Sequence, residues 1–107
     1  MSAADHLRAR QLHERWFTLD THLDTPTARL MRPGWDFGAR HAFGDDGSQC
    51  DLPRMVDGGL AGAVFAVYVG QAARTPEGLA TAHARAVACL ERTHEVLRLN
   101  AAQAGLA

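Results

Sequence analysis

The segment whose residue types and spacing could do chemistry runs from Trp16 to Pro26, WFTLDTHLDTP. Bulky and polar residues alternate in its first half, a pattern typical of a β-strand, and residues two apart in a strand project from the same face. His22 and Asp24 are therefore predicted to point the same way at a strand end. Imidazole nitrogen and carboxylate oxygen both bind zinc at about 2.0–2.2 Å, so the pair could share one metal ion. The alternative is that they hydrogen-bond each other and nearby backbone at the start of a loop.

The elements that must position this pair are predicted from periodicity, caps and breakers. They are a helix over residues 3–15, a strand over 16–22, a long loop over 25–49, a short helix capped by Asp51 and ended by Gly58-Gly59, a strand over 61–69 and a helix over about 76–102. The second strand, AGAVFAVYV, is a continuous apolar run, typical of a parallel strand buried on both faces. The last helix begins with Thr75 as cap and proline at its first position.

Alternation of strand and helix predicts an α/β fold with parallel strands. Such a sheet is stable when both of its faces are covered, and three helices cannot cover every face and edge of two strands. A complete (β/α)₈ barrel takes about 250 residues. We therefore expect that the 107 residues form about the first quarter of a larger domain and that the chain is truncated.

Composition excludes several classes of function. The formal charge is −1, with 47% hydrophobic and 21% charged residues, so no basic surface for nucleic acid is expected. No apolar run reaches the roughly 20 residues that span a bilayer, and the charged N-terminus lacks the apolar centre of a secretory signal. We therefore expect a cytoplasmic protein without a membrane segment. Cys50 and Cys89 have no metal-type spacing and are expected to be reduced thiols.

Other candidate residues are weaker. His41 lies near Asp45 and Asp46, but in a polar loop, so we expect a solvated histidine rather than a metal ligand. Trp35 and Phe37 could contact a substrate or anchor the loop, and the sequence leaves both interpretations open.

Two segments in order resemble the zinc-dependent dipeptidases of the membrane (renal) dipeptidase type, peptidase family M19. The first is LDTHLDTP, which is similar to the family's Asp-x-His-x-Asp stretch at the end of the first barrel strand. The second is CDLPRMVDGGLAGAVFAVYV, which resembles the family's segment around the second strand. A loop of the expected size separates them, and a long helix containing CLERTHEVLRL follows. The resemblance covers about residues 8 to 100.

The resemblance implies a (β/α)₈ (TIM) barrel of metal-dependent hydrolase type, of which residues 1–107 would be the N-terminal part with the first two βα units. It implies two zinc ions bridged by a glutamate and a small dipeptide as substrate. Carried over by position, His22 and Asp24 would be ligands of one zinc, Asp20 would support them or the fold, and Tyr68 would be a weak candidate for lining the substrate pocket. The family's remaining ligands lie on later strands, so the isolated chain is expected to lack activity.

Two other hypotheses stay open. The chain could be a non-catalytic α/β fragment that associates through AVFAVYV, an apolar strand that is prone to aggregate when uncovered. It could also be a related metal hydrolase of the amidohydrolase type, although that group more often shows His-x-His at this place. A homo-oligomer is compatible with each hypothesis.

Overall fold

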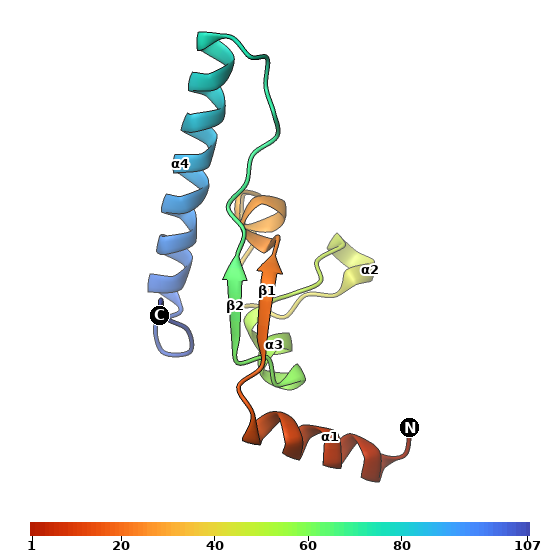
Figure 1. The fold of residues 1–107 in the computed structure, drawn as a ribbon. Coiled ribbons are helices and arrows are strands. Elements are labelled where there is room, and N and C mark those ends of the chain that lie inside the picture. Colours follow the sequence, from red (N-terminus) through yellow and green to blue (C-terminus); the bar gives the residue numbers. More distant parts are fainter.

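The computed structural model describes all 107 residues and shows a mixed α/β arrangement around a small parallel sheet (Figure 1). The elements in chain order are α1 (Ala3–Arg15), β1 (Leu19–Leu23), the π-helix η1 (Pro26–Leu30), α2 (Phe43–Asp46), α3 (Leu52–Gly58), β2 (Gly62–Phe65) and α4 (Pro76–Leu99).

The two strands pair in parallel, with Leu19 opposite Gly62 and Leu23 opposite Phe65. Both arrows in Figure 1 point the same way, so the carboxyl ends of β1 and β2 lie together. The chain returns from one strand to the next through η1, α2 and α3, as parallel pairing requires a crossover. The predicted parallel α/β organisation is thus confirmed for these two strands.

Both strands are shorter than the predicted ranges 16–22 and 61–69. β1 starts only at Leu19, because Gly62, its partner, is the first residue of β2. β2 ends at Phe65, because the partner chain leaves the sheet after Leu23 and turns into η1 at Pro26. The prediction that the second strand is buried on both faces is also wrong, since Val64 is half exposed.

The helix ends follow local sequence rules. Thr75 caps α4 by accepting a hydrogen bond from Gly78 N, and Asp51 caps α3 by accepting one from Arg54 N, as predicted. α3 closes at Gly59, whose φ of 69° suits glycine. α4 ends at Leu99 rather than near 102, because the side-chain amide of Asn100 donates to Val96 O and competes with further helix.

The hydrophobic core is built largely by the segment predicted to be a loop, residues 25–49. The core residues are Leu30, Trp35, Phe37, Leu52 and Val96. The prediction of a mostly irregular loop is therefore incomplete, because this segment contains η1 and α2 and supplies three of the five core side chains. The ring of Phe37 meets Phe65 of β2 edge to face, with centroids 5.6 Å apart, and so ties the loop to the sheet.

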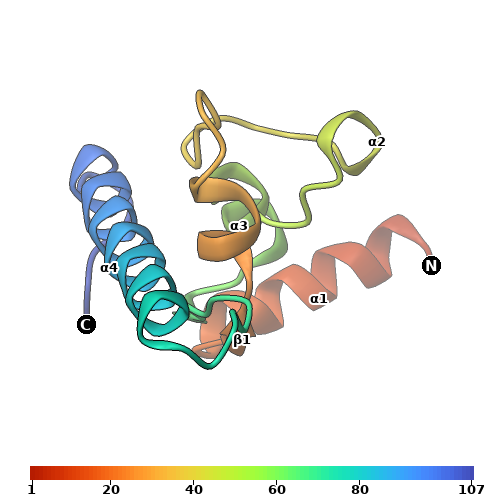
Figure 2. The ribbon, with the colours of Figure 1, turned by 90° about the horizontal axis from the view of Figure 1, so that it is seen from above.

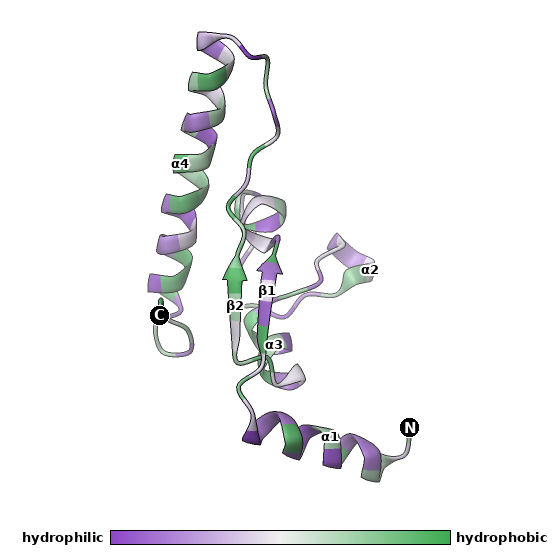
Figure 3. Ribbon diagram, in the orientation of Figure 1, coloured by the Kyte–Doolittle hydropathy of each residue, from purple (hydrophilic) through white to green (hydrophobic).

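The molecule is extended, with dimensions of 58 × 30 × 24 Å and a radius of gyration of 16.5 Å. A compact domain of 100 residues has a radius of gyration of about 13 Å. Figure 2 shows α1 extending away from α4, and α1 has no buried residue. Figure 3 shows hydrophobic residues along β2, where no second layer covers one face of the sheet. None of the helices combines the length and apolar composition needed to cross a membrane.

Candidate functional site

A β-bulge sits at the carboxyl end of β1. Asp20 pairs with Ala63 and Leu23 pairs with Phe65, so β1 uses three steps where β2 uses two. The extra residue falls in the segment that contains His22, whose N–H donates to Oδ1 of Asp20 at 2.8 Å. A bulge re-aims the side chains beside it and ends regular pairing. Asp20, predicted to support the ligands or the fold, here binds the backbone of His22.

His22 and Asp24 meet at this strand end, as the two-residue spacing predicts. Nε2 of His22 lies 3.0 Å from Oδ1 of Asp24, and the two side chains are 70% and 53% exposed. Asp24 occupies the step between β1 and η1, and its carbonyl accepts a hydrogen bond from Ala28 N at 2.9 Å. The pair is therefore fixed on its backbone side and open to solvent on the other.

The donor set can be compared with what a metal ion requires. Two ligand atoms bound to one tetrahedral zinc at about 2.0–2.2 Å lie roughly 3.4 Å apart. The His22–Asp24 separation of 3.0 Å would have to open by only a few tenths of an ångström. A zinc site needs three or four protein ligands, and the structure places no group of three or more His, Cys, Asp or Glu side chains together. The pair fits as part of a metal site, with the remaining ligands absent from this cluster.

Tyr68, the weak pocket candidate, lies in the segment that continues β2 and is half exposed. Its backbone contacts η1, since Oγ1 of Thr27 donates to Tyr68 O at 2.8 Å and accepts from Tyr68 N at 3.3 Å. The phenol ring makes no hydrogen bond. The structure thus places the backbone of Tyr68 against η1, the element that follows Asp24.

Asp51 is the centre of a buried polar network below the long loop. Its fully buried carboxylate accepts hydrogen bonds from the backbone N–H of His41 at 2.9 Å and from Nε of Arg54 at 2.6 Å. Arg54 also donates to the backbone and side-chain oxygens of Ser48. Burial raises the pKa of Asp51, but the hydrogen bonds from His41 and Arg54 outweigh it and hold that pKa below its usual value.

Asp46 is the second anchor of this loop. It accepts hydrogen bonds from Ser48 N at 2.7 Å and from Nε1 of Trp35 at 2.8 Å, and Nδ1 of His41 lies 3.0 Å away. The hydrogen bonds from Ser48 are the main cause of a pKa well below the usual value for this carboxyl. His41 also stacks on Trp35, with ring centroids 4.4 Å apart.

The prediction that His41 is a solvated loop residue is therefore wrong. Its ring is mostly buried between Trp35, Asp46 and the carbonyl of Asp36, and it holds the loop together. The loop looked solvated because it is rich in polar residues and glycine. The short-range signals that could have found this network are Asp46-x-Ser48, which forms a side-chain turn, and Asp51 three residues before Arg54.

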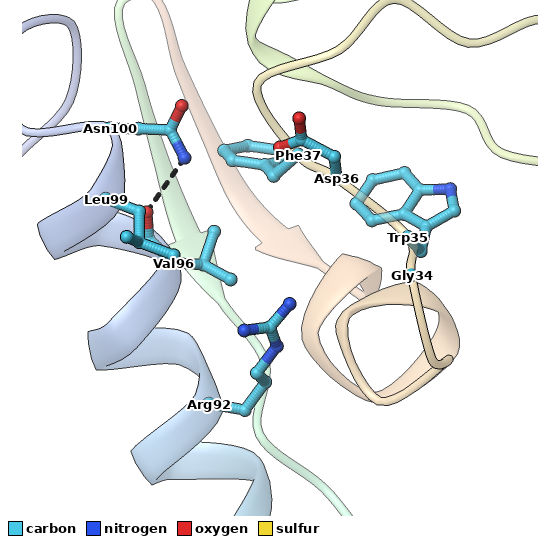
Figure 4. A pocket seen from close by; sticks show the side chains of 8 residues that line it. All are labelled: Gly34, Trp35, Asp36, Phe37, Arg92, Val96, Leu99 and Asn100. Atoms are coloured by element: carbon cyan, nitrogen blue, oxygen red, sulfur yellow. Dashed lines mark hydrogen bonds between the residues drawn. The ribbon is translucent and has the colours of Figure 1, made fainter.

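Trp35 and Phe37 anchor the loop. Both are buried in the core, and they also line one wall of a cavity of about 340 Å³ against α4 (Figure 4). The opposite wall is formed by Arg92, Val96 and Leu99 of α4. Neither His22 nor Asp24 lines this cavity.

Both cysteines are free and buried, in agreement with the predicted reduced thiols. Burial, and next the charge of Asp51, raises the pKa of Cys50. A thiol with a raised pKa is a poor nucleophile, so Cys50 supports packing rather than covalent chemistry.

The lowered pKa values of Asp46 and Asp51 predict a pH dependence of stability. A carboxyl with a lower pKa in the folded than in the unfolded chain binds fewer protons when folded, so its contribution is present above the unfolded value of about 3.9 and is lost as the pH falls. The free energy of unfolding, measured with urea, should decrease as the pH falls from about 5 to about 3. The free energy of unfolding should depend less steeply on pH in Asp46→Asn than in the parent chain. Asp45→Asn should show the parent's dependence, because the exposed carboxylate of Asp45 makes no hydrogen bond. Equal slopes in all three proteins would contradict this assignment.

Comparison with known proteins gives a result for nearly the whole chain. The family model described as membrane dipeptidase (peptidase family M19) matches residues 6–107. No curated protein matches the chain.

Proposed function

This chain belongs to the membrane dipeptidase family, peptidase family M19, and on that premise we propose that it is part of a zinc-dependent dipeptidase. His22 and Asp24 are the proposed ligands of one zinc ion. The observation that carries this proposal is the 3.0 Å contact between Nε2 of His22 and Oδ1 of Asp24 at the carboxyl end of β1. The substrate in this proposal is a small dipeptide.

The proposed fold of the whole enzyme is a (β/α)₈ barrel, of which this chain forms the first two βα units. Three features support it: two neighbouring strands that pair in parallel, a helix after the second strand, and a polar pair at the strand ends. In βα-barrels the residues that do chemistry lie at the carboxyl ends of the strands. The uncovered face of β2, with Val64 half exposed, suits further strands and helices packing on it.

Each residue of the site then has a defined task. When bound, zinc supplies Lewis-acid chemistry, polarising the peptide carbonyl and making a water molecule more acidic. His22 and Asp24 hold the cation, and Asp20 fixes the backbone from which His22 projects. The open side of the pair leaves room for a dipeptide. The second zinc, its bridging glutamate and the groups that hold the substrate are expected on other strands of the barrel.

A non-catalytic fragment that associates with other chains remains the second candidate. The specific observation in its favour is the exposure of large apolar side chains, among them Trp16, Phe17 and Val64. A related metal hydrolase of the amidohydrolase type is the third candidate. Residue 24 is an aspartate where that group more often carries histidine, which favours the dipeptidase.

Calorimetric titration with zinc tests the proposal. His22 and Asp24 supply two of the three or four protein ligands that zinc requires, so the folded chain should bind one zinc ion weakly and a chelator should remove it. Magnesium, which prefers six oxygen ligands, should give no such isotherm. If zinc binds equally well to the parent chain and to folded His22→Ala and Asp24→Ala variants, the family membership stands and the metal role of the pair is wrong. The coding sequence downstream of Ala107 offers a second check. It should encode strands that end in an acidic ligand and two histidines.

A further inference from the structure

We infer that Thr27 is a positioning residue for the His22–Asp24 pair, a role that rests on the proposed zinc site. Thr27 touches neither side chain of the pair. It lies three residues after Asp24, in η1, and its hydroxyl joins η1 to the segment that continues β2.

The regular ladder between the strands ends just before this point. Its last backbone bond runs from Ala66 N to Leu23 O at 2.9 Å. Beyond Leu23 the first strand turns into η1, so its backbone no longer offers partners to residues 67 and 68. A segment that has lost its ladder partner would be free to move unless another group pairs with it.

The hydroxyl of Thr27 takes over that pairing. Oγ1 donates to Tyr68 O at 2.8 Å and accepts from Tyr68 N at 3.3 Å, so one side chain satisfies both backbone groups of one residue. Sγ of the buried Cys89 on α4 lies 3.9 Å from the same oxygen. The same oxygen also lies 3.5 Å from Ala66 O, so the hydroxyl is surrounded by the backbone of the segment that follows β2.

The consequence reaches Asp24 through the backbone. Its carbonyl accepts the first bond of the following turn, from Ala28 N, and its neighbour Leu23 is the last residue paired with β2. Asp24 therefore lies between two fixed points, the end of the ladder and Thr27. Pro26 and Leu30 bury η1 by apolar contact, but neither side chain can hydrogen-bond to Tyr68. Loss of the Thr27 hydroxyl would leave η1 packed but would no longer fix its position relative to β2. The distance between His22 and Asp24 depends on that position.

The variants that test this inference are Thr27→Val, which keeps the branched shape and removes the hydroxyl, and Thr27→Ser, which keeps the hydroxyl. Thr81→Val is the control, because Thr81 is exposed on α4 and its hydroxyl bonds only to Glu77 O one turn away. We expect Thr27→Val to weaken zinc binding about tenfold, in the range found when groups that orient metal ligands are lost. Thr27→Ser and Thr81→Val should bind zinc like the parent chain.

Two measurements on the metal-free chain test this inference independently of zinc binding. In Thr27→Val, but not in Thr27→Ser, the amide of Tyr68 should exchange with solvent faster and the ring ¹⁵N shifts of His22 should change. Unchanged zinc affinity and unchanged His22 shifts in Thr27→Val would overturn the positioning role and leave the proposed function intact. If zinc binds equally well to the parent chain and to His22→Ala, the proposed zinc site fails, and the His22 shifts still decide whether Thr27 aligns the pair.

Discussion

With His22 and Asp24 as the proposed zinc ligands, replacing His22 by alanine is expected to abolish measurable zinc binding, and Asp24→Ala should do the same. Each substitution removes one of two donors that lie 3.0 Å apart, and no third His, Cys, Asp or Glu side chain stands close enough to replace it. Loss of groups that merely orient a ligand costs ten- to a hundredfold in metal affinity, so loss of a ligand should cost at least about a hundredfold. Calorimetry on the folded variants measures this directly.

Matched controls come from exposed residues of the same types. His83 lies on the exposed face of α4 and Asp45 lies in α2, and alanine at either position should leave zinc binding unchanged. The side chains of His22 and Asp24 are themselves exposed, so neither substitution should disturb folding, which circular dichroism can verify. Undiminished zinc binding by either His22→Ala or Asp24→Ala would show that the metal binds elsewhere.

Replacing Asp51 by alanine is expected to have the largest effect on stability. The carboxylate is fully buried, caps α3 and accepts three hydrogen bonds, from His41 N, Arg54 N and Arg54 Nε. Its removal leaves the Arg54 guanidinium without its charged partner. Breaking a buried ion pair costs about 3–5 kcal/mol, and the partial exposure of Arg54 places the cost near the lower end, about 3 kcal/mol.

Urea unfolding measures this cost, with two comparisons. Asp57→Ala breaks the ion pair with Arg40, in which both side chains are 57% exposed, and should cost about 0–1 kcal/mol. Asp51→Asn keeps an oxygen that can cap the helix and should fall between the two. A cost for Asp51→Ala no larger than that for Asp57→Ala would mean that the network does not hold the loop.

Local sequence determined several features of this chain without help from tertiary structure. Strand alternation places His22 and Asp24 on one side, and the structure shows them in contact. The capping roles of Asp51 and Thr75 and the end of α3 at Gly59 also follow from neighbours within a few residues. These features are predictable because the atoms that make them are close in sequence, so backbone geometry alone decides the outcome.

Tertiary structure decided what depends on partners far along the chain. The lengths of both strands and the bulge that aims His22 follow from the register between β1 and β2. Burial of His41 and the bridge from Thr27 to Tyr68, 41 residues apart, likewise appear only when distant segments meet. The sequence around Thr27 does not indicate which backbone groups its hydroxyl will bind. Its partner is chosen by packing of the whole fold, which no local pattern contains.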